Sequence, residues 1–151
     1  MDIVSPEKRS RMMSGIHSKN TKPEMRIRQA LHARGFRYRI HSPEVYGKPD
    51  IIMKKHNAII FIHGCFWHGH DCPLFRLPKT RTEFWQKKID TNRERDKKVY
   101  SRLRDEGWRI AIIWECSMRG KGKMDFLTLV DILAEWIESD QETLTLHGEK
   151  I

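Results

Sequence analysis

The sequence predicts an α/β fold in which a mixed β-sheet is flanked by helices. Short apolar segments with the composition of strands lie on both sides of a long segment with helical periodicity, around residues 80–106. Amphipathic helical segments begin and end the series, so the expected order is helix, three strands, helix, strand, helix. Elements in this order form mixed sheets that helices cover.

Two helices are expected before the first strand. Ser5-Pro6-Glu7 has the pattern of an N-cap followed by proline and opens a short helix in a basic N-terminal arm, residues 1–20. Thr21-Lys22-Pro23-Glu24 is a capping box, and the helix that it starts ends at Gly35.

Four segments have the composition of strands. Phe36 to Ile40 alternates apolar and basic residues, as a half-exposed strand does. Asp50 to Met53 and Ala58 to Ile62 are apolar runs joined by KKHN and predict a hairpin, whose second strand is buried. Trp108 to Glu115 is rich in β-branched residues.

Two further helices complete the predicted domain. Thr80-Arg81-Thr82-Glu83 is a second capping box, and its helix runs to about Glu106. Met124 to Ser139 has the pattern of an amphipathic helix. Residues 139–151 are expected to be a C-terminal tail, and residues 1–151 a single domain.

Composition narrows the class of protein. The chain has no apolar run near the roughly 18 residues of a membrane span, and its first residues lack the apolar region of a signal peptide. Its three cysteines cannot all pair within one chain, which favours a reducing, cytoplasmic setting. The net charge of +9, spread along the chain, indicates a polyanionic partner such as nucleic acid. The alternative is a solvated basic protein without such a partner.

The three cysteines and one nearby histidine predict a metal site. Cys65, His70, Cys72 and Cys116 supply three thiolates and one imidazole, a complete tetrahedral set for structural Zn²⁺. Spacing alone leaves His68 as a competing nitrogen ligand, and Cys116 has the alternative of a buried residue at a strand end.

A second set of polar residues has the composition of a hydrolytic site. Asp96 lies on the apolar face of the long helix, where it needs a partner such as an arginine or lies at the edge of a site. Asp50 at a strand start can hold a divalent cation, and His63 or His68 can act as a general base with a carboxylate on its other nitrogen. Each residue also has a purely structural interpretation.

Five motifs together resemble the very short patch repair endonucleases. They are GKPD at 47–50, IHGCFWHGHDCPLF at 62–75, TRTEFW at 80–85, NRERD at 92–96 and WECSMRG at 114–120. The resemblance implies a restriction-endonuclease-like fold. It also implies a Mg²⁺-dependent, strand-specific nick in duplex DNA, 5′ of the thymine in a T·G mismatch left by deamination of 5-methylcytosine.

The resemblance also implies a role for each site residue. Asp50 and the backbone carbonyl of Ile62 would bind Mg²⁺, while His68, oriented by Asp96, would be the base. His63 would lie near the scissile phosphate, with Glu24 close to the site. The implied zinc ligands are Cys65, His70, Cys72 and Cys116.

The chain departs from the general restriction-endonuclease signature. The strand after Asp50 ends Phe61-Ile62-His63, without the acid and lysine of that signature. The same replacement is typical of the very short patch repair family, in which only a backbone oxygen is needed at position 62.

Aromatic residues provide a means of sensing the mismatch. Apolar wedges inserted between base steps open a mismatched step more cheaply than a paired one. The resemblance implies this role for Phe66, Trp67 and Trp85, with Met12 or Met13 of the N-terminal arm entering from the other groove. The alternative, burial in the core, fits Trp108, Trp114 and Trp136, whereas the Cys/His loop offers little room to bury both Phe66 and Trp67.

Two other functions stay open at this point. One is a zinc-stabilised DNA-binding module without chemistry, and the other is a nuclease of the same fold that acts on another DNA structure. The expected enzyme is a cytoplasmic monomer, nucleoid-associated when active, with duplex DNA and mismatch-repair proteins as partners.

Overall fold

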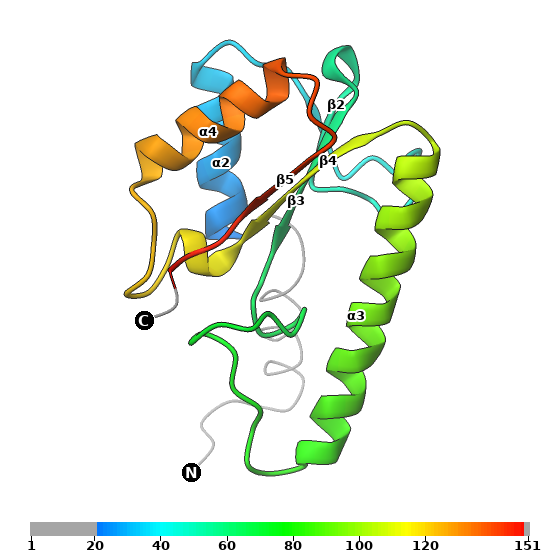
Figure 1. Cartoon of the computed structure of the whole chain (residues 1–151), viewed down its shortest axis with the longest axis vertical. Helices are drawn as coiled ribbons and strands as arrows, with labels where there is room; N and C mark the ends of the chain where they lie inside the picture. Colours follow the sequence, from blue (N-terminus) through cyan, green and yellow to red (C-terminus); the bar gives the residue numbers. More distant parts are fainter. Residues whose placement is uncertain (1–20, 150–151) are drawn as a thin grey trace, which may run out of the picture.

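A five-stranded mixed sheet forms the centre of the molecule. The computed structural model describes residues 21–149. The strands are β1 (Arg39–Ile40), β2 (Ile51–Met53), β3 (Ala58–His63), β4 (Arg109–Trp114) and β5 (Thr143–Leu146), adjacent in that order (Figure 1). β1, β2 and β3 are antiparallel, whereas β3, β4 and β5 are parallel, so the predicted mixed sheet is confirmed.

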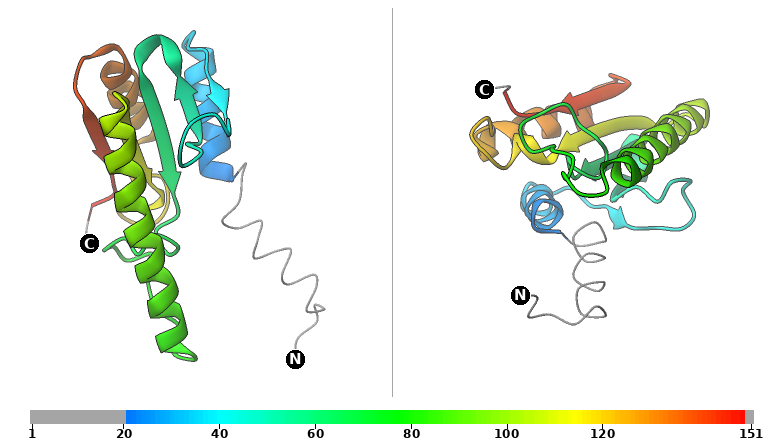
Figure 2. Two further views of the ribbon diagram at one scale, coloured as in Figure 1. Left: turned by 90° about the vertical axis from the view of Figure 1, so that its right-hand side faces the viewer. Right: turned by 90° about the horizontal axis from the view of Figure 1, so that it is seen from below.

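Three α-helices cover the two faces of this sheet. They are α2 (Lys22–Ala33), α3 (Thr82–Asp105) and α4 (Phe126–Glu138), with short 3₁₀ helices η1 (Lys54–His56) and η2 (Glu115–Ser117). Apolar side chains of α2 and α4 pack with Ile60 and Ile113 on one face. Leu103 of α3 packs with Ile59 and Phe61 on the other, which gives three layers (Figure 2).

The helix starts only partly follow the predicted capping boxes. The Thr21 hydroxyl accepts a hydrogen bond from the Glu24 amide at 3.4 Å, as expected, and Asp125 caps α4 in the same way. The second capping box is wrong. Arg81, and not Thr80, is the N-cap of α3, and its side chain makes no capping hydrogen bond.

The first predicted strand is shorter than expected. The Phe36 amide donates to the Leu31 carbonyl, so Phe36 belongs to the turn that ends α2. The Tyr38 hydroxyl donates to the Arg28 carbonyl and holds the next residues against the same helix. Only Arg39 and Ile40 remain to pair with β2.

The predicted C-terminal tail contains a strand. Residues 143–146 form β5 along β4, and the Ile110 amide donates to the Glu142 carbonyl at 2.9 Å. No sequence pattern indicates this strand within the tail, because its four residues are too few to show a clear alternation.

Two other predictions concern the N-terminal arm and membrane spans. The N-terminal arm, with the helix expected after Ser5 and the proposed wedge residues Met12 and Met13, lies outside residues 21–149. Within residues 21–149, none of the helices combines the length and the apolar character that crossing a membrane requires.

Candidate active site and metal cluster

Two clusters of polar side chains lie where β3 and β4 end. The strands are parallel and pair up to His63 and Trp114, so their carboxyl ends meet at one edge. The loop of residues 64–72 leaves β3 there, and η2 follows β4. This topology brings Cys65 beside Cys116, although 51 residues separate them in the chain.

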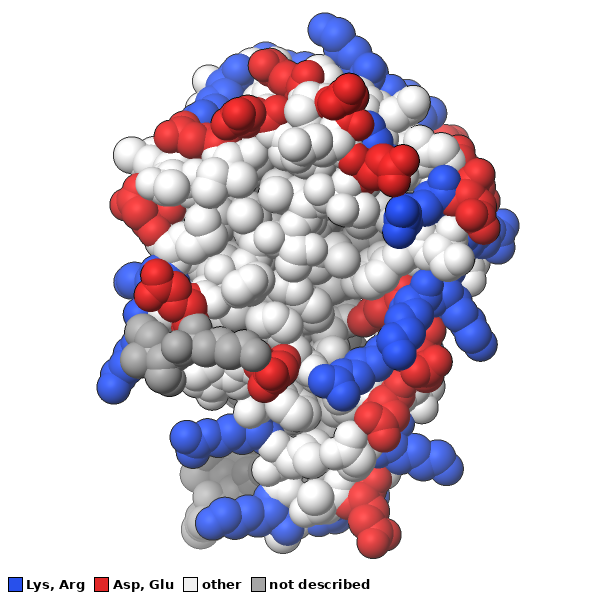
Figure 3. Space-filling view, viewed as in Figure 1, with Lys and Arg blue, Asp and Glu red and all other residues white. Residues whose placement is uncertain are grey.

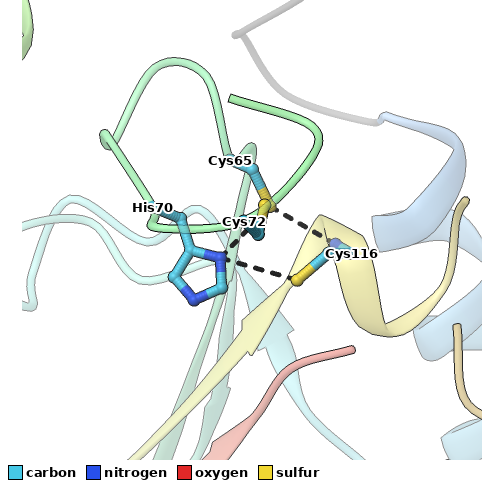
Figure 4. Close-up of side chains that lie close together, drawn as sticks. All are labelled: Cys65, His70, Cys72 and Cys116. Atoms are coloured by element: carbon cyan, nitrogen blue, oxygen red, sulfur yellow. Dashed lines mark hydrogen bonds between the residues drawn. The ribbon is translucent and has the colours of Figure 1, made fainter. Parts of the chain in front are cut away.

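The first cluster contains all three cysteines. Ligand atoms of Cys65, His70, Cys72 and Cys116 all lie within 4.8 Å of one another, and the side chains converge (Figure 4). The His70 Nδ1 lies 3.6 Å from the Cys65 Sγ and 3.5 Å from the Cys116 Sγ. The structure thus brings His70, and not His68, to the cysteines.

Burial shapes the chemistry of these thiols. Cys65 and Cys116 are buried, and burial raises the pKa of both thiols, with Cys72 adding to the rise. Backbone amides oppose it: the Cys116 amide donates to the Cys65 Sγ and the Gly148 amide to the Cys116 Sγ, each at 3.3 Å. Several thiolates in one buried place need a cation to balance their charge, and a metal ion provides one.

The second cluster is built around two histidines. The His68 Nδ1 lies 2.6 Å from the Asp96 Oδ2, so the carboxylate on the inner face of α3 has the imidazole as a partner. His63 stacks on His68 with ring centroids 3.8 Å apart, and its Nε2 bonds the Tyr100 hydroxyl. Burial, with a smaller electrostatic effect of the neighbouring His68 ring, holds the pKa of His63 well below its usual range, so His63 is neutral.

Asp50 lies beside these histidines at the start of β2. The Ile62 amide donates to the Asp50 Oδ2 at 2.7 Å, which fixes the carboxyl group against β3. Burial raises the pKa of Asp50 to about 7, and the carboxylate of Glu24 adds to the rise while the Ile62 amide opposes it. Glu24 itself is buried and bonds His41 and Arg28.

One cavity joins the second cluster to solvent. It has a volume of about 840 Å³, and its lining includes Asp50, His63, His68, Asp96 and Glu24. Arg95 and Arg119 also line it and add positive charge to its wall. Basic side chains, mixed with acidic ones, occupy the surface along α3 and the lower part of the molecule, while the middle of the same face is uncharged (Figure 3).

The predicted wedge residues form an aromatic group at the cavity. The ring centroid of Phe66 lies 5.1 Å from that of Trp67 and 5.6 Å from that of Trp85. Phe66 and Trp67 line the cavity. Trp67 is only 9% exposed whereas Phe66 is half-buried, so the loop buries one of the two rings and not both. The burial of Trp67 follows from packing against α3, where the Asn92 side chain donates to the Trp67 carbonyl at 2.9 Å.

The sequence did not identify several residues that support the site. Tyr100 lies one turn after Asp96 on the apolar face of the long helix and so fits the core by sequence, but its hydroxyl bonds the His63 Nε2. Trp114 was also assigned to the core; its ring stacks on His70 at 4.1 Å and lies 5.3 Å from His63. No sequence pattern points to His41, which reaches Glu24 only through the fold.

Comparisons with known proteins agree with this geometry. The sequence profile of the family described as DNA mismatch endonuclease Vsr matches residues 1–74. The Escherichia coli DNA mismatch endonuclease Vsr is 42% identical over 136 residues, which cover 90% of this chain and 87% of that protein. The type II nicking enzyme V.XorIIP of Xanthomonas oryzae is 43% identical over 124 residues, or 82% of this chain and 91% of the relative.

A third relative extends the same pattern. The type II nicking enzyme V.NmeAIP of Neisseria meningitidis is 46% identical over 120 residues, which cover 80% of this chain and 86% of that protein. Identity at this level over most of both chains, together with the family profile, shows common descent. The chain belongs to the Vsr family of DNA mismatch endonucleases.

Proposed function

We propose that this protein nicks one strand of duplex DNA, 5′ of the thymine in T·G mismatches that arise from deamination of 5-methylcytosine. The observation that carries the proposal is the convergence of Asp50 and the His68–Asp96 pair on one open cavity. Membership of a family of DNA mismatch endonucleases supports the choice of substrate.

His68 is proposed as the general base. A carboxylate only accepts hydrogen bonds, so Asp96 selects the tautomer of His68 with its proton on Nδ1. The Nε2 of His68 is then free of a proton and can take one from the attacking water. The neutral His63, held by the Tyr100 hydroxyl, stacks on His68 and limits the positions that its ring can adopt.

Asp50 and the backbone carbonyl of Ile62 are proposed as ligands of a catalytic Mg²⁺. In a strand the N–H and C=O of one residue point to the same side, and the Ile62 amide already faces Asp50. Burial and the Glu24 carboxylate raise the pKa of Asp50 although the Ile62 amide and Arg28 oppose them, so the ionised carboxylate needs further positive charge. A divalent cation supplies that charge and stabilises the negative charge that develops on the phosphate.

The Cys/His cluster is proposed to hold a structural Zn²⁺. A tetrahedral ion with Zn–S of about 2.3 Å and Zn–N of about 2.0 Å places sulfur and nitrogen ligands about 3.6 Å apart. The two sulfur–nitrogen separations of 3.6 and 3.5 Å match this edge. Four protein ligands leave no open position, so this ion would stabilise the loop rather than take part in hydrolysis.

The aromatic group of Phe66, Trp67 and Trp85 is proposed as the wedge that detects the mismatch. Phe66 and Trp67 line the same cavity as the proposed base, so an opened base step would lie beside the scissile phosphate. Action as a monomer, a cytoplasmic location and mismatch-repair partners remain predictions from the sequence.

A cleavage experiment tests this function. End-labelled duplexes that differ only in one T·G, C·G or A·T pair are incubated with the protein and Mg²⁺. Wild type should nick the T·G duplex alone, Asp50→Asn should not nick it, and the exposed control Asp105→Asn should behave as wild type. Equal nicking of all three duplexes would indicate another substrate, and no nicking by the wild type would indicate a binding module.

A further inference from the structure

A third group of polar side chains includes Asp50 but neither of the stacked histidines. It consists of Glu24 on α2, His41 after β1 and Asp50, whose ligand atoms all lie within 4.8 Å of one another. The His41 Nε2 lies 2.7 Å from the Glu24 Oε2. Side-chain exposure is only 12% for His41 and 3% for Glu24, so the group is largely shielded from water.

The charges of this group favour a cation. Two carboxyl groups meet in a buried place, and the guanidinium of Arg28, 3.4 Å from Glu24, balances only one of them. Like charges at such distances cannot both ionise without compensation. A divalent ion between Glu24 and Asp50 would compensate both, with the imidazole of His41 as a neutral third ligand.

The geometry of the group also suits a single ion. Neighbouring ligands of an octahedral ion with bonds of about 2.1 Å lie about 3 Å apart. The separation between His41 and Glu24 is close to that edge. His41 has a left-handed backbone (φ 51°), which is uncommon for a residue other than glycine and persists where the surroundings fix it.

We propose that Glu24, His41 and Asp50 bind one first-row divalent transition-metal ion, such as Mn²⁺, through two carboxylates and one imidazole nitrogen. This site rests on the proposed function only because both treat Asp50 as a cation ligand. It adds His41 as a nitrogen donor and specifies a class of metal ion that would bind. An imidazole ligand favours transition-metal ions over Mg²⁺. Mg²⁺ prefers oxygen ligands and gives up its bound water molecules reluctantly.

The test measures metal binding directly, in zinc-loaded full-length protein without DNA. The affinity for Mn²⁺ is obtained from the electron paramagnetic resonance signal of the free ion. Spin-echo modulation of the bound ion then reports whether a nitrogen is directly coordinated. Wild type should bind one Mn²⁺ with a coordinated nitrogen, and excess Mg²⁺ should displace it poorly.

The decisive variant is His41→Asn, because asparagine tolerates a positive φ. It should lose the nitrogen signal and bind Mn²⁺ about tenfold more weakly. Loss of a residue that only supports a metal ligand already lowers metal affinity by about this factor. Its Mg²⁺ affinity should stay unchanged. Circular dichroism and zinc content establish that the variant is folded, and His32→Gln, on the exposed end of α2, should match wild type in both measurements.

The group of His63, His68 and Asp96 is the other source of a nitrogen ligand, so His68→Asn is measured in parallel. Persistence of the nitrogen signal in His68→Asn and its loss in His41→Asn supports the proposal. The reverse pattern, or a nitrogen signal in neither wild type nor variant, overturns it. Nicking of T·G duplex with Mg²⁺ is scored separately, so a failure of the proposed function is distinguishable from a failure of this metal site.

Discussion

The Cys/His cluster and the His68–Asp96 cluster share one short loop but differ in their access to solvent. In the first, four ligand atoms face one another and two of the cysteines are buried. In the second, the side chains of His68 and Asp96 keep exposures of 24% and 19% and line a cavity of about 840 Å³. A closed ligand set suits structure, whereas an open one suits chemistry.

Because the two clusters are close together, the first can hold in place the loop that carries His68 of the second. Cys65 and His70 flank His68 in sequence, so an ion in the first cluster would fix both sides of the proposed base. Trp114 stacks on His70 and also contacts the histidine pair, and thus links the two clusters through rings. A catalytic group on a loop gains precision from such support. The comparison predicts that changes in one cluster affect stability and changes in the other affect rate.

The largest expected effect is on the rate of nicking. Asp96→Asn replaces an acceptor that fixes the tautomer of His68 with a group that can also donate. The nicking rate on T·G duplex should fall by about 100- to 10,000-fold, the range for loss of general-base catalysis. Zinc content should not change, and Glu94→Gln on the exposed face of α3 is the control. A rate within twofold of wild type would remove Asp96 from the mechanism.

A large effect on stability is expected for the Cys/His cluster. Cys72→Ser keeps the shape of the side chain but lowers the affinity for zinc, so the protein should lose its metal and unfold at a lower urea concentration. The expected loss is several kcal/mol of unfolding free energy, measured by urea denaturation with zinc analysis. His147→Gln, whose ring lies 6.3 Å from His70, is the matched control. A zinc-free wild type of equal stability would contradict the structural role.

A smaller, pH-dependent effect is expected at Asp50. Because the folded pKa of Asp50 is raised from 3.8 to about 7, the folded protein binds a proton over this range that the unfolded chain has released. The free energy of unfolding should therefore include a contribution that is lost as pH rises through about 7. Asp50→Asn should be more stable than wild type at pH 8, and the difference should shrink towards pH 5. Urea denaturation without Mg²⁺ tests this, and a difference independent of pH would refute the raised pKa.

The smallest effect is expected at the aromatic wedge. Phe66→Ala removes a half-buried ring from the cavity. The preference for T·G over C·G duplex should fall about tenfold, or about 1.4 kcal/mol, which is part of the cost of unstacking a base step. The ratio of nicking rates on the two duplexes measures this preference. Leu127→Ala, an exposed apolar residue on α4, is the control. An unchanged ratio would remove Phe66 from recognition.

Much of the fold was predictable because its signals are local. The β-hairpin of β2 and β3, strand β4 and helices α3 and α4 follow from apolar periodicity, and their residue ranges agree with the structure. The Cys/His cluster was predictable because cysteine and histidine are rare and closely spaced around residue 70. The sequence left His68 and His70 as alternatives, and the fold separates them by pointing their rings into different clusters.

The remaining features depend on contacts between distant segments. Strand β5 is defined by its pairing with β4 rather than by its own four residues. His41 approaches Glu24 because the turn after β1 returns to α2, and Trp67 is buried because α3 passes beside the loop. The sequence around each of these residues carries no sign of its partner, so local patterns could not predict the contact.

The division into a structural cluster and a catalytic cluster is tested most directly by measuring zinc content and nicking activity on the same preparations. Wild type and Asp50→Asn are purified in parallel, analysed for zinc, and incubated with end-labelled T·G duplex and Mg²⁺. Both proteins should hold one zinc per chain, and only the wild type should nick the strand 5′ of the thymine. Loss of zinc from Asp50→Asn, or nicking by it at the rate of the wild type, would contradict the division of this loop into a structural and a catalytic part.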